Sequence, residues 1–307
     1  MGRYVLRRLL QMIPVFIGTT FLIFYMVYSL GDPIAALFQG KAPDPAVANQ
    51  LRHSLWLDRP LWEQYLHYMA GVFQGNFGTS FNGTSVTSLM FSAFPTTLKL
   101  TVVAFVFEMI VGIVLGVFSG MRRGGFTDTF VLLFTLLIIS IPIFVIGFVL
   151  QYLLGVKWHI INPSVSYGAP WNELIVPGLV LASTSLAYVA RLTRTTVAEN
   201  ARADYVRTAV AKGLPGHRVV IHHLLRNSLI PVVTFLGTDL GALMGGALIT
   251  EQIFNIQGVG YNLYQGIQQQ NTDTVVGFVT ILVIIYLIAN LLVDLLYAVL
   301  DPRIRYV

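Results

Sequence analysis

Residues 9–30 read LLQMIPVFIGTTFLIFYMVYSL, a run of 22 residues without a charged side chain. A helix needs about 20 apolar residues to cross the hydrocarbon core of a bilayer, so this run predicts a transmembrane helix. Arg3, Arg7 and Arg8 precede it as in a secretory signal peptide, but the run is too long for the apolar core of such a peptide. It ends at Gly31-Asp32-Pro33 without a cleavage pattern, and we therefore expect an uncleaved first helix.

The composition of the whole chain is that of a membrane protein. Of its 307 residues, 55% are hydrophobic and 11% are charged, and the mean hydropathy is +0.72; soluble domains carry about 25% charged residues. Five further apolar runs are long enough to span a bilayer: residues 100–121, 130–156, 174–190, 229–250 and 275–300. The sequence predicts an all-α integral membrane protein with six transmembrane helices. Pro14, Pro142 and Pro177 interrupt these runs or their starts, and each can kink its helix.

The positive charges divide unequally between the two sides of the membrane. Of the 19 Lys and Arg residues, 14 fall on the side of the N-terminus and 4 on the other side, with Lys99 at a boundary. Positive charge is retained on the cytoplasmic side, so both termini are predicted to be cytoplasmic. Seven of these cations lie between Arg191 and Arg226, within one loop.

Several classes of site are not expected. The chain has no cysteine, which excludes disulfides, thiolate metal sites and cysteine nucleophiles. Its six histidines have no carboxylate at ligand spacing, so no metal site is predicted. No basic stretch is interleaved with aromatic residues, and the expected partner surface is therefore membrane lipid and not nucleic acid.

Two polar regions lie on opposite sides of the predicted membrane. Residues 31–95 are too aromatic for a disordered linker, and they predict a small helical extracytoplasmic cap with an amphipathic helix over residues 61–73. The predicted organisation is thus residues 1–30 for the N-terminal end and first helix, residues 31–95 for the cap, and residues 96–307 for a core. The core includes a cytoplasmic segment at residues 193–228.

Within that segment, residues 204–214 read DYVRTAVAKGL and predict a short helix. Tyr205, Val206, Ala209 and Lys212 or Gly213 share one face, with Asp204 able to cap the start and Gly213 able to end the helix. One interpretation is a basic helix lying on anionic lipid. The residues between its charges are small, however, which favours insertion into a groove of another protein.

These residues resemble the EAA loop of ABC-importer permeases, and more narrowly the B-type subunit of the oligopeptide/dipeptide/nickel family. The resemblance continues through LRNSLIPVVT at residues 225–234. It runs through nearly the whole chain, in motifs at residues 4–9, 31–33, 75–78, 254–260 and 294–306. Each motif alone is weak, but their order and spacing together are specific.

The resemblance implies a type I importer permease with six helices in a bacterial or archaeal cell membrane. Its implied partners are a homologous second permease, two cytoplasmic ATPase domains that bind ATP and Mg, and an extracytoplasmic solute-binding protein; no cofactor is implied on this chain. The EAA segment would be the coupling helix, seated in a groove of one ATPase domain. Its implied contact residues are Asp204, Tyr205, Arg207, Thr208, Ala209, Lys212, Gly213 and Leu214.

Two positions depart from the family pattern. Arg207 stands in place of the Glu that names the general motif, as is common in the peptide subfamily. After Asn271 the family usually has a Tyr-Pro pair, whereas this chain has Thr272-Asp273. The second departure leaves open the local geometry before the sixth helix and the detail of the external gate.

Small and acidic residues within the spans are further candidates. Gly237, Gly241 and Gly245 form a stripe that lets another helix approach closely, either within the chain or on a second permease. Acidic groups at membrane depth are costly, so Glu108, Asp239 and Glu251 are candidate translocation-pathway residues. The alternatives are structural pairing or a position near the membrane surface, and these also apply to Asp294.

The function expected from the sequence is the permease subunit of an ATP-driven importer for dipeptides, oligopeptides or related small solutes, including glutathione, haem or nickel complexes. The chain is not expected to be an enzyme, because it has neither a G-x-x-x-x-G-K-[ST] phosphate loop nor a G-x-S-x-G nucleophile motif. The alternative is a secondary transporter driven by an ion gradient through Glu108 or Asp239. Such a protein usually shows an internal repeat with broken helices in both halves, and no repeat is evident.

Overall fold

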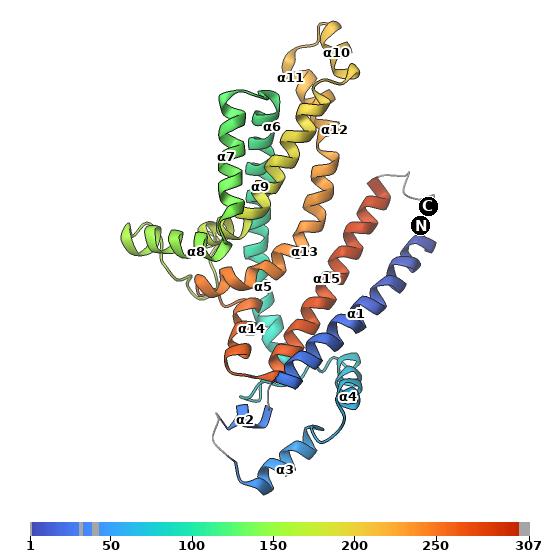
Figure 1. The fold of residues 1–307 in the computed structure, drawn as a ribbon, viewed down its shortest axis with the longest axis vertical. Coiled ribbons are helices and arrows are strands. Elements are labelled where there is room, and N and C mark those ends of the chain that lie inside the picture. Colours follow the sequence, from blue (N-terminus) through green and yellow to red (C-terminus); the bar gives the residue numbers. More distant parts are fainter. Residues whose placement is uncertain (1, 31–32, 39–42, 301–307) are drawn as a thin grey trace. The chain divides into compact units, whose positions relative to one another are not determined.

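The computed structural model describes residues 2–30, 33–38 and 43–300, and every regular element in this part of the chain is a helix (Figure 1). The elements are α1 (Gly2–Leu30), α2 (Pro33–Leu37), α3 (Pro45–Ser54), α4 (Leu61–Phe73), α5 (Val86–Phe107), η1 (Glu108–Gly112), α6 (Ile113–Met121), α7 (Phe126–Ser140), α8 (Ile143–Leu150), η2 (Gln151–Lys157), α9 (Ile175–Asn200), α10 (Asp204–Ala211), α11 (Gly216–Arg218), η3 (Val219–Leu225), α12 (Arg226–Ser228), α13 (Ile230–Ile253), α14 (Val259–Gln268) and α15 (Thr272–Leu300). Two compact units can be distinguished, one formed by residues 1–97 and 257–307 and the other by residues 98–256.

Five of these helical segments are long and apolar enough to cross a membrane. They are Val5–Ser29, Val86–Met121, Ile175–Asn200, Ile230–Ile253 and Thr272–Leu291. Val86–Met121 and Ile175–Asn200 extend well beyond the apolar runs that predict them, because helix formation continues through polar residues that hydropathy excludes. The all-helical class is confirmed, with five spans, or six if the bent pair that follows counts as one.

The predicted third span, residues 130–156, is not one straight helix. α7 and the segment Ile143–Lys157 meet at an angle of 98°. Pro142 is the N-cap of α8, and Ile141 before it has an extended backbone. Proline disfavours the helical conformation of the residue before it and donates no backbone hydrogen bond, so the break occurs here.

In the unit of residues 98–256, α9 is the central helix and packs against α6, α7, α8, η1 and α13. Close approach to α6 and η1 depends on three glycines spaced four residues apart: Gly112, Gly116 and Gly120. A Cβ at Gly116 would lie 2.6 Å from the carbonyl oxygen of Ala190 on α9. Only glycine therefore permits this helix spacing.

In the unit of residues 1–97 and 257–307, α1 runs beside α15 (Figure 1), and α4 packs against α1. The predicted amphipathic stretch 61–73 coincides with α4. Its buried side is Tyr65, Met69 and Val72, which pack with Phe24 of α1. The Tyr65 and Thr20 hydroxyls are also hydrogen-bonded at 2.9 Å.

Some predicted features lie outside the described residues. These are Gly31-Asp32 of the motif at residues 31–33, Lys41 of the cap and residues 301–306 of the C-terminal motif. Asp294 lies in α15, and its side chain is outside the described part of the chain.

Candidate functional site

The predicted coupling segment contains α10, which spans Asp204–Ala211. Ala203, and not Asp204, is the N-cap residue, and no side chain caps this end. The prediction that Asp204 caps the helix is therefore wrong. Its side chain is fully exposed and lies 3.9 Å from the Arg207 guanidinium within the first turn.

The C-terminal end of α10 is a Schellman motif. Gly213 has a φ of +74°, and its N–H donates to the Val210 carbonyl at 2.9 Å. The Leu214 N–H donates to the Ala209 carbonyl at 3.3 Å. Glycine is favoured in this left-handed position because a Cβ strains it, which explains why the helix ends here as expected.

The cytoplasmic segment has a small hydrophobic core of its own. Val206 and Ala209 of α10 are buried against Val219 of η3, with Leu214 packed beside them. Ala209 is only 4% exposed. Only part of the predicted contact face is therefore accessible. Ala209 fills this core and is not available to a groove of another protein. An aspartate at position 209 would bury a charge here and unfold the segment.

The remaining α10 residues of the predicted contact set form its outer surface. Tyr205 is 39% exposed. The other exposed residues, which include Val210 in addition to the predicted set, are Asp204, Arg207, Thr208, Val210, Lys212 and Gly213. A Cβ on Gly213 would meet no atom within 4 Å, so nothing within this chain fills the space beside it.

Two hydrogen bonds tie this segment to the central helix α9. The Tyr205 hydroxyl donates to Oδ1 of Asn200 at 2.6 Å, at the end of α9. The Ser228 hydroxyl donates to the Thr196 carbonyl at 3.3 Å and to the Leu224 carbonyl at 2.9 Å. These bonds attach the segment to α9, which contacts α6, α7 and α13 in the same unit.

A buried ion pair joins three helices of this unit, and the sequence analysis missed it. Arg194 of α9 donates through Nε and Nη2 to the two oxygens of Asp128, both at 2.8 Å. The Ser119 hydroxyl of α6 donates to Asp128 Oδ1 at 2.6 Å, and the Gly124 N–H donates to Oδ2 at 2.8 Å. Asp128 is 2% exposed. The sequence contains one signal that could have revealed this pair, an acidic residue in the first turn of an apolar helix.

Glu108 and Asp239 come together from η1 and α13. Glu108 is fully buried at the start of a π-helical turn, and the Asp239 carboxyl is the neighbour of its own carboxyl group. Neither Glu108 oxygen nor Asp239 Oδ2 has a hydrogen-bond partner among the described residues. Neighbouring carboxyls in an apolar interior disfavour two negative charges. The structure therefore brings together two of the predicted pathway residues. No cation among the described residues is paired with them.

We expect Glu108→Gln to leave the free energy of unfolding unchanged or to raise it. The amide has the size of the carboxyl, carries no charge and donates a hydrogen bond to Asp239. Glu108→Ala should lower the same free energy by about 2 kcal/mol or more, because it leaves a cavity. Denaturant unfolding of the purified chain in detergent measures both, with the exposed Glu199→Gln as control. An equal loss in Glu108→Gln and Glu108→Ala would contradict the expectation.

The remaining predicted residues are placed differently. Glu251 is fully buried near the end of α13, which contradicts the alternative that it simply reaches water. In the glycine stripe of α13, Gly241 is buried, Gly237 is half-buried and Gly245 is exposed. A Cβ on Gly245 would meet no atom within 4 Å, so Gly245 makes no close helix contact within this chain.

Two family models match the sequence. One, described as the binding-protein-dependent transport system inner membrane component, matches residues 112–306. The other, described as the N-terminal part of the membrane component of the same systems, matches residues 1–101. The first model covers more than half of the chain, including α10 and the ion pair.

Full-length relatives are similar to the whole chain. The dipeptide transport system permease protein DppB of Escherichia coli K12 is 37% identical over 337 residues, covering 100% of this chain and 99% of the relative. A probable peptide ABC transporter permease of Sinorhizobium fredii is 35% identical, with 100% of both chains covered. The glutathione transport system permease protein GsiC of Pectobacterium atrosepticum is also 35% identical, with both chains covered completely.

Proposed function

Because the chain belongs to the family of binding-protein-dependent transport system inner membrane components and is the permease subunit of an ABC importer, we propose that it carries dipeptides or oligopeptides. The observation that carries the proposal is the end-to-end similarity to permeases named for dipeptides and peptides. Glutathione is the second candidate, since a relative named for it is equally well covered. The family consists of membrane permeases and not ATPases.

The chain is a multi-pass membrane protein, and its relatives are components of ABC transport systems. In our proposal it lies in a bacterial inner membrane with both termini cytoplasmic and residues 31–95 outside. A homologous second permease completes the pathway, and two cytoplasmic ATPase domains bind ATP and Mg. A solute-binding protein delivers the solute from outside. The positive charge between Arg191 and Arg226 supports this orientation.

The proposed mechanism couples two equilibria through α10. ATP binding between the ATPase domains favours the state that is closed to the cytoplasm, and the loaded binding protein favours the same state. The exposed surface of α10 contacts an ATPase domain, and the Tyr205–Asn200 hydrogen bond passes its displacement to α9. Of the predicted stripe of Gly237, Gly241 and Gly245, the exposed Gly245 is proposed to face the second permease, whereas Gly241 is buried within this chain.

Reconstitution into liposomes tests this function. The chain with its partner subunits, binding protein and ATP should accumulate a radiolabelled dipeptide, whereas the chain alone should neither hydrolyse ATP nor accumulate solute. Uptake by the chain alone under a proton or sodium gradient would establish the alternative, a secondary transporter, and remove the importer proposal.

We expect Gly213→Asn to abolish uptake while α10 stays folded. Asparagine tolerates the left-handed backbone, and no atom of this chain occupies the space of its side chain. Loss of uptake would therefore indicate that an ATPase domain packs against residue 213. The measurement is ATP-dependent uptake, with binding of the ATPase subunits followed by co-purification. Arg202→Asn, at an exposed position outside the predicted contact set, is the control for a change of surface polarity. Full uptake in Gly213→Asn would argue against the contact.

A further inference from the structure

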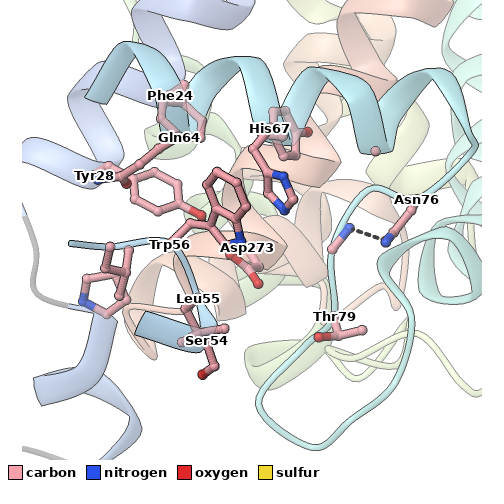
Figure 2. Close-up of a pocket in the computed structure, with 15 residues that line it drawn as sticks. Phe24, Tyr28, Ser54, Leu55, Trp56, Gln64, His67, Asn76, Thr79 and Asp273 are labelled. Atoms are coloured by element: carbon pink, nitrogen blue, oxygen red, sulfur yellow. Dashed lines mark hydrogen bonds between the residues drawn. The ribbon is translucent and has the colours of Figure 1, made fainter. Parts of the chain in front are cut away.

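A cavity of about 280 Å³ lies within the unit of residues 1–97 and 257–307 (Figure 2). Its walls come from α1, the turn after α3, α4 and the first turn of α15. Asp273 of α15 lines it, at the position where the chain departs from the Tyr-Pro pair usual in its family. None of the described residues that line the cavity is Lys or Arg.

Two of the residues that line the cavity, Asp273 and Gln64, carry hydrogen-bond acceptors. The Tyr28 hydroxyl donates to Asp273 Oδ1 at 2.8 Å, which fixes the carboxylate in the cavity wall. Gln64 donates its Nε2 to the Arg59 carbonyl at 2.7 Å, so its Oε1 must be the free end of the amide. Gln64 is 9% exposed, and this Oε1 is buried without a partner in the described structure. A buried acceptor is stable only when a donor reaches it.

Aromatic rings form much of the remaining wall. Phe24 stacks on Tyr28 with ring centroids 4.2 Å apart, and Trp56 stacks on His67 at 4.3 Å. The Arg59 guanidinium lies 5.9 Å from the centroid of the Trp56 ring. Trp56 has a φ of +60°, a strained conformation for a bulky residue. Such strain persists where the surroundings hold it and is often found at functional sites. Here it places an indole ring in the cavity wall, where Figure 2 shows it near Asp273.

We propose that this cavity binds the ammonium or guanidinium group of a transported solute. Such a group carries a positive charge and several N–H donors, which match a carboxylate, an amide oxygen and aromatic faces. A metal ion fits less well, because no group of three or more His, Cys, Asp or Glu side chains gathers among the described residues. Ligand pockets usually have volumes of about 300–1,000 Å³, so this smaller cavity takes one charged group and not a whole peptide.

The Tyr68 phenol beside the cavity is a hydrogen-bond donor and not a competing anion. Burial raises the pKa of the Tyr68 phenol above its ordinary value, and its hydroxyl is hydrogen-bonded to Thr280 Oγ1 at 2.9 Å. The carboxyl group in the cavity wall is that of Asp273. The inference rests on the proposed function, in which this cavity lies on the extracytoplasmic side.

Binding of a matched pair of probes tests the site. The full chain in lipid nanodiscs is titrated with argininamide and with citrullinamide, which has nearly the same shape without the positive charge. Isothermal titration calorimetry should detect argininamide only. Asp273→Asn should raise its Kd at least tenfold, and Gln64→Met should raise it several-fold, because each removes an acceptor. Equal binding of both probes, or an unchanged Kd in Asp273→Asn, would overturn the proposal.

Two further variants test the role of the Tyr28 hydrogen bond and whether the effect is specific to the cavity. Tyr28→Phe removes the hydrogen bond to Asp273 but keeps the negative charge, and it should raise the Kd less than Asp273→Asn does. Asp58→Asn is the matched control: Asp58 lies in the segment between α3 and α4 but outside the cavity, and its hydrogen bond to His53 lowers its pKa. The Kd should not change in this variant, and a Kd raised as much as in Asp273→Asn would contradict the assignment.

Failure of this site can be told from failure of the proposed function. Asp273→Asn should lose uptake of an arginine-containing dipeptide while it keeps ATP-dependent uptake of a neutral dipeptide. If the native complex takes up neither dipeptide, the peptide-importer proposal is rejected. Calorimetry would still decide whether the cavity binds organic cations. Unchanged selectivity between the two dipeptides in Asp273→Asn would reject the site alone.

Discussion

Arg194→Ala is expected to lower the free energy of unfolding by about 3–5 kcal/mol, the cost of removing one partner of a buried ion pair. Arg194 donates two hydrogen bonds of 2.8 Å to Asp128, whose side chain is 3% exposed. Without the guanidinium, this carboxylate keeps only the Ser119 and Gly124 donors. Because the pair connects α9 to α7 and Ser119 adds α6, the loss should separate the ends of three helices.

Denaturant unfolding in detergent measures this effect. Arg191→Ala is the matched control, since Arg191 lies one turn earlier on α9 and is exposed; its effect should stay within about 0.5 kcal/mol. The double variant Asp128→Asn/Arg194→Met should recover part of the loss, because it removes both charges and keeps an acceptor for Ser119. A loss in Arg194→Ala no greater than in Arg191→Ala would show that the ion pair does not stabilise the helix ends.

Gly116→Val should disrupt the packing of α6 on α9, with a loss of about 3 kcal/mol or more in the free energy of unfolding. Its Cβ would lie 2.5 Å from the Cβ of Thr193 and 2.6 Å from the Ala190 carbonyl oxygen. The obstacle is backbone and Cβ of the facing helix, which cannot rotate away as a flexible side chain can. Thermal unfolding in detergent and protease resistance of the purified chain measure the effect.

Gly245→Ala is the control for Gly116→Val, because Gly245 is a helical glycine that no other described helix of this chain approaches closely. Its Cβ would meet open space within this chain, and alanine favours helix more than glycine by about 1 kcal/mol. The variant should therefore be as stable as the native chain or more stable. If Gly245→Ala is stable but no longer assembles with the second permease, the stripe lies at the subunit interface. A loss as large as that of Gly116→Val would contradict the open position of Gly245.

The coupling segment shows what sequence reasoning reaches and where it stops. Gly213 marks the end of α10, since only a left-handed residue completes the turn and glycine adopts that conformation most easily. The same pattern assigned Ala209 to a contact face, whereas the structure buries it against Val219. Helical periodicity shows which residues share a face but not what covers that face. The covering residues lie in η3, which has no recognisable relation to α10 in the sequence.

The amino-acid sequence alone was enough to predict the helical class, five of the six spans, the family and the ends of several helices. Hydrophobicity, helix periodicity and glycine conformation are properties of short stretches, and each stretch carries them wherever it folds. Only the tertiary structure decided which polar groups meet. Asp128 and Arg194 are 66 residues apart in the chain, and Tyr28 and Asp273 are 245 apart. Their pairing depends on the register and crossing of packed helices, which arises from many weak contacts together and has no local sequence signature.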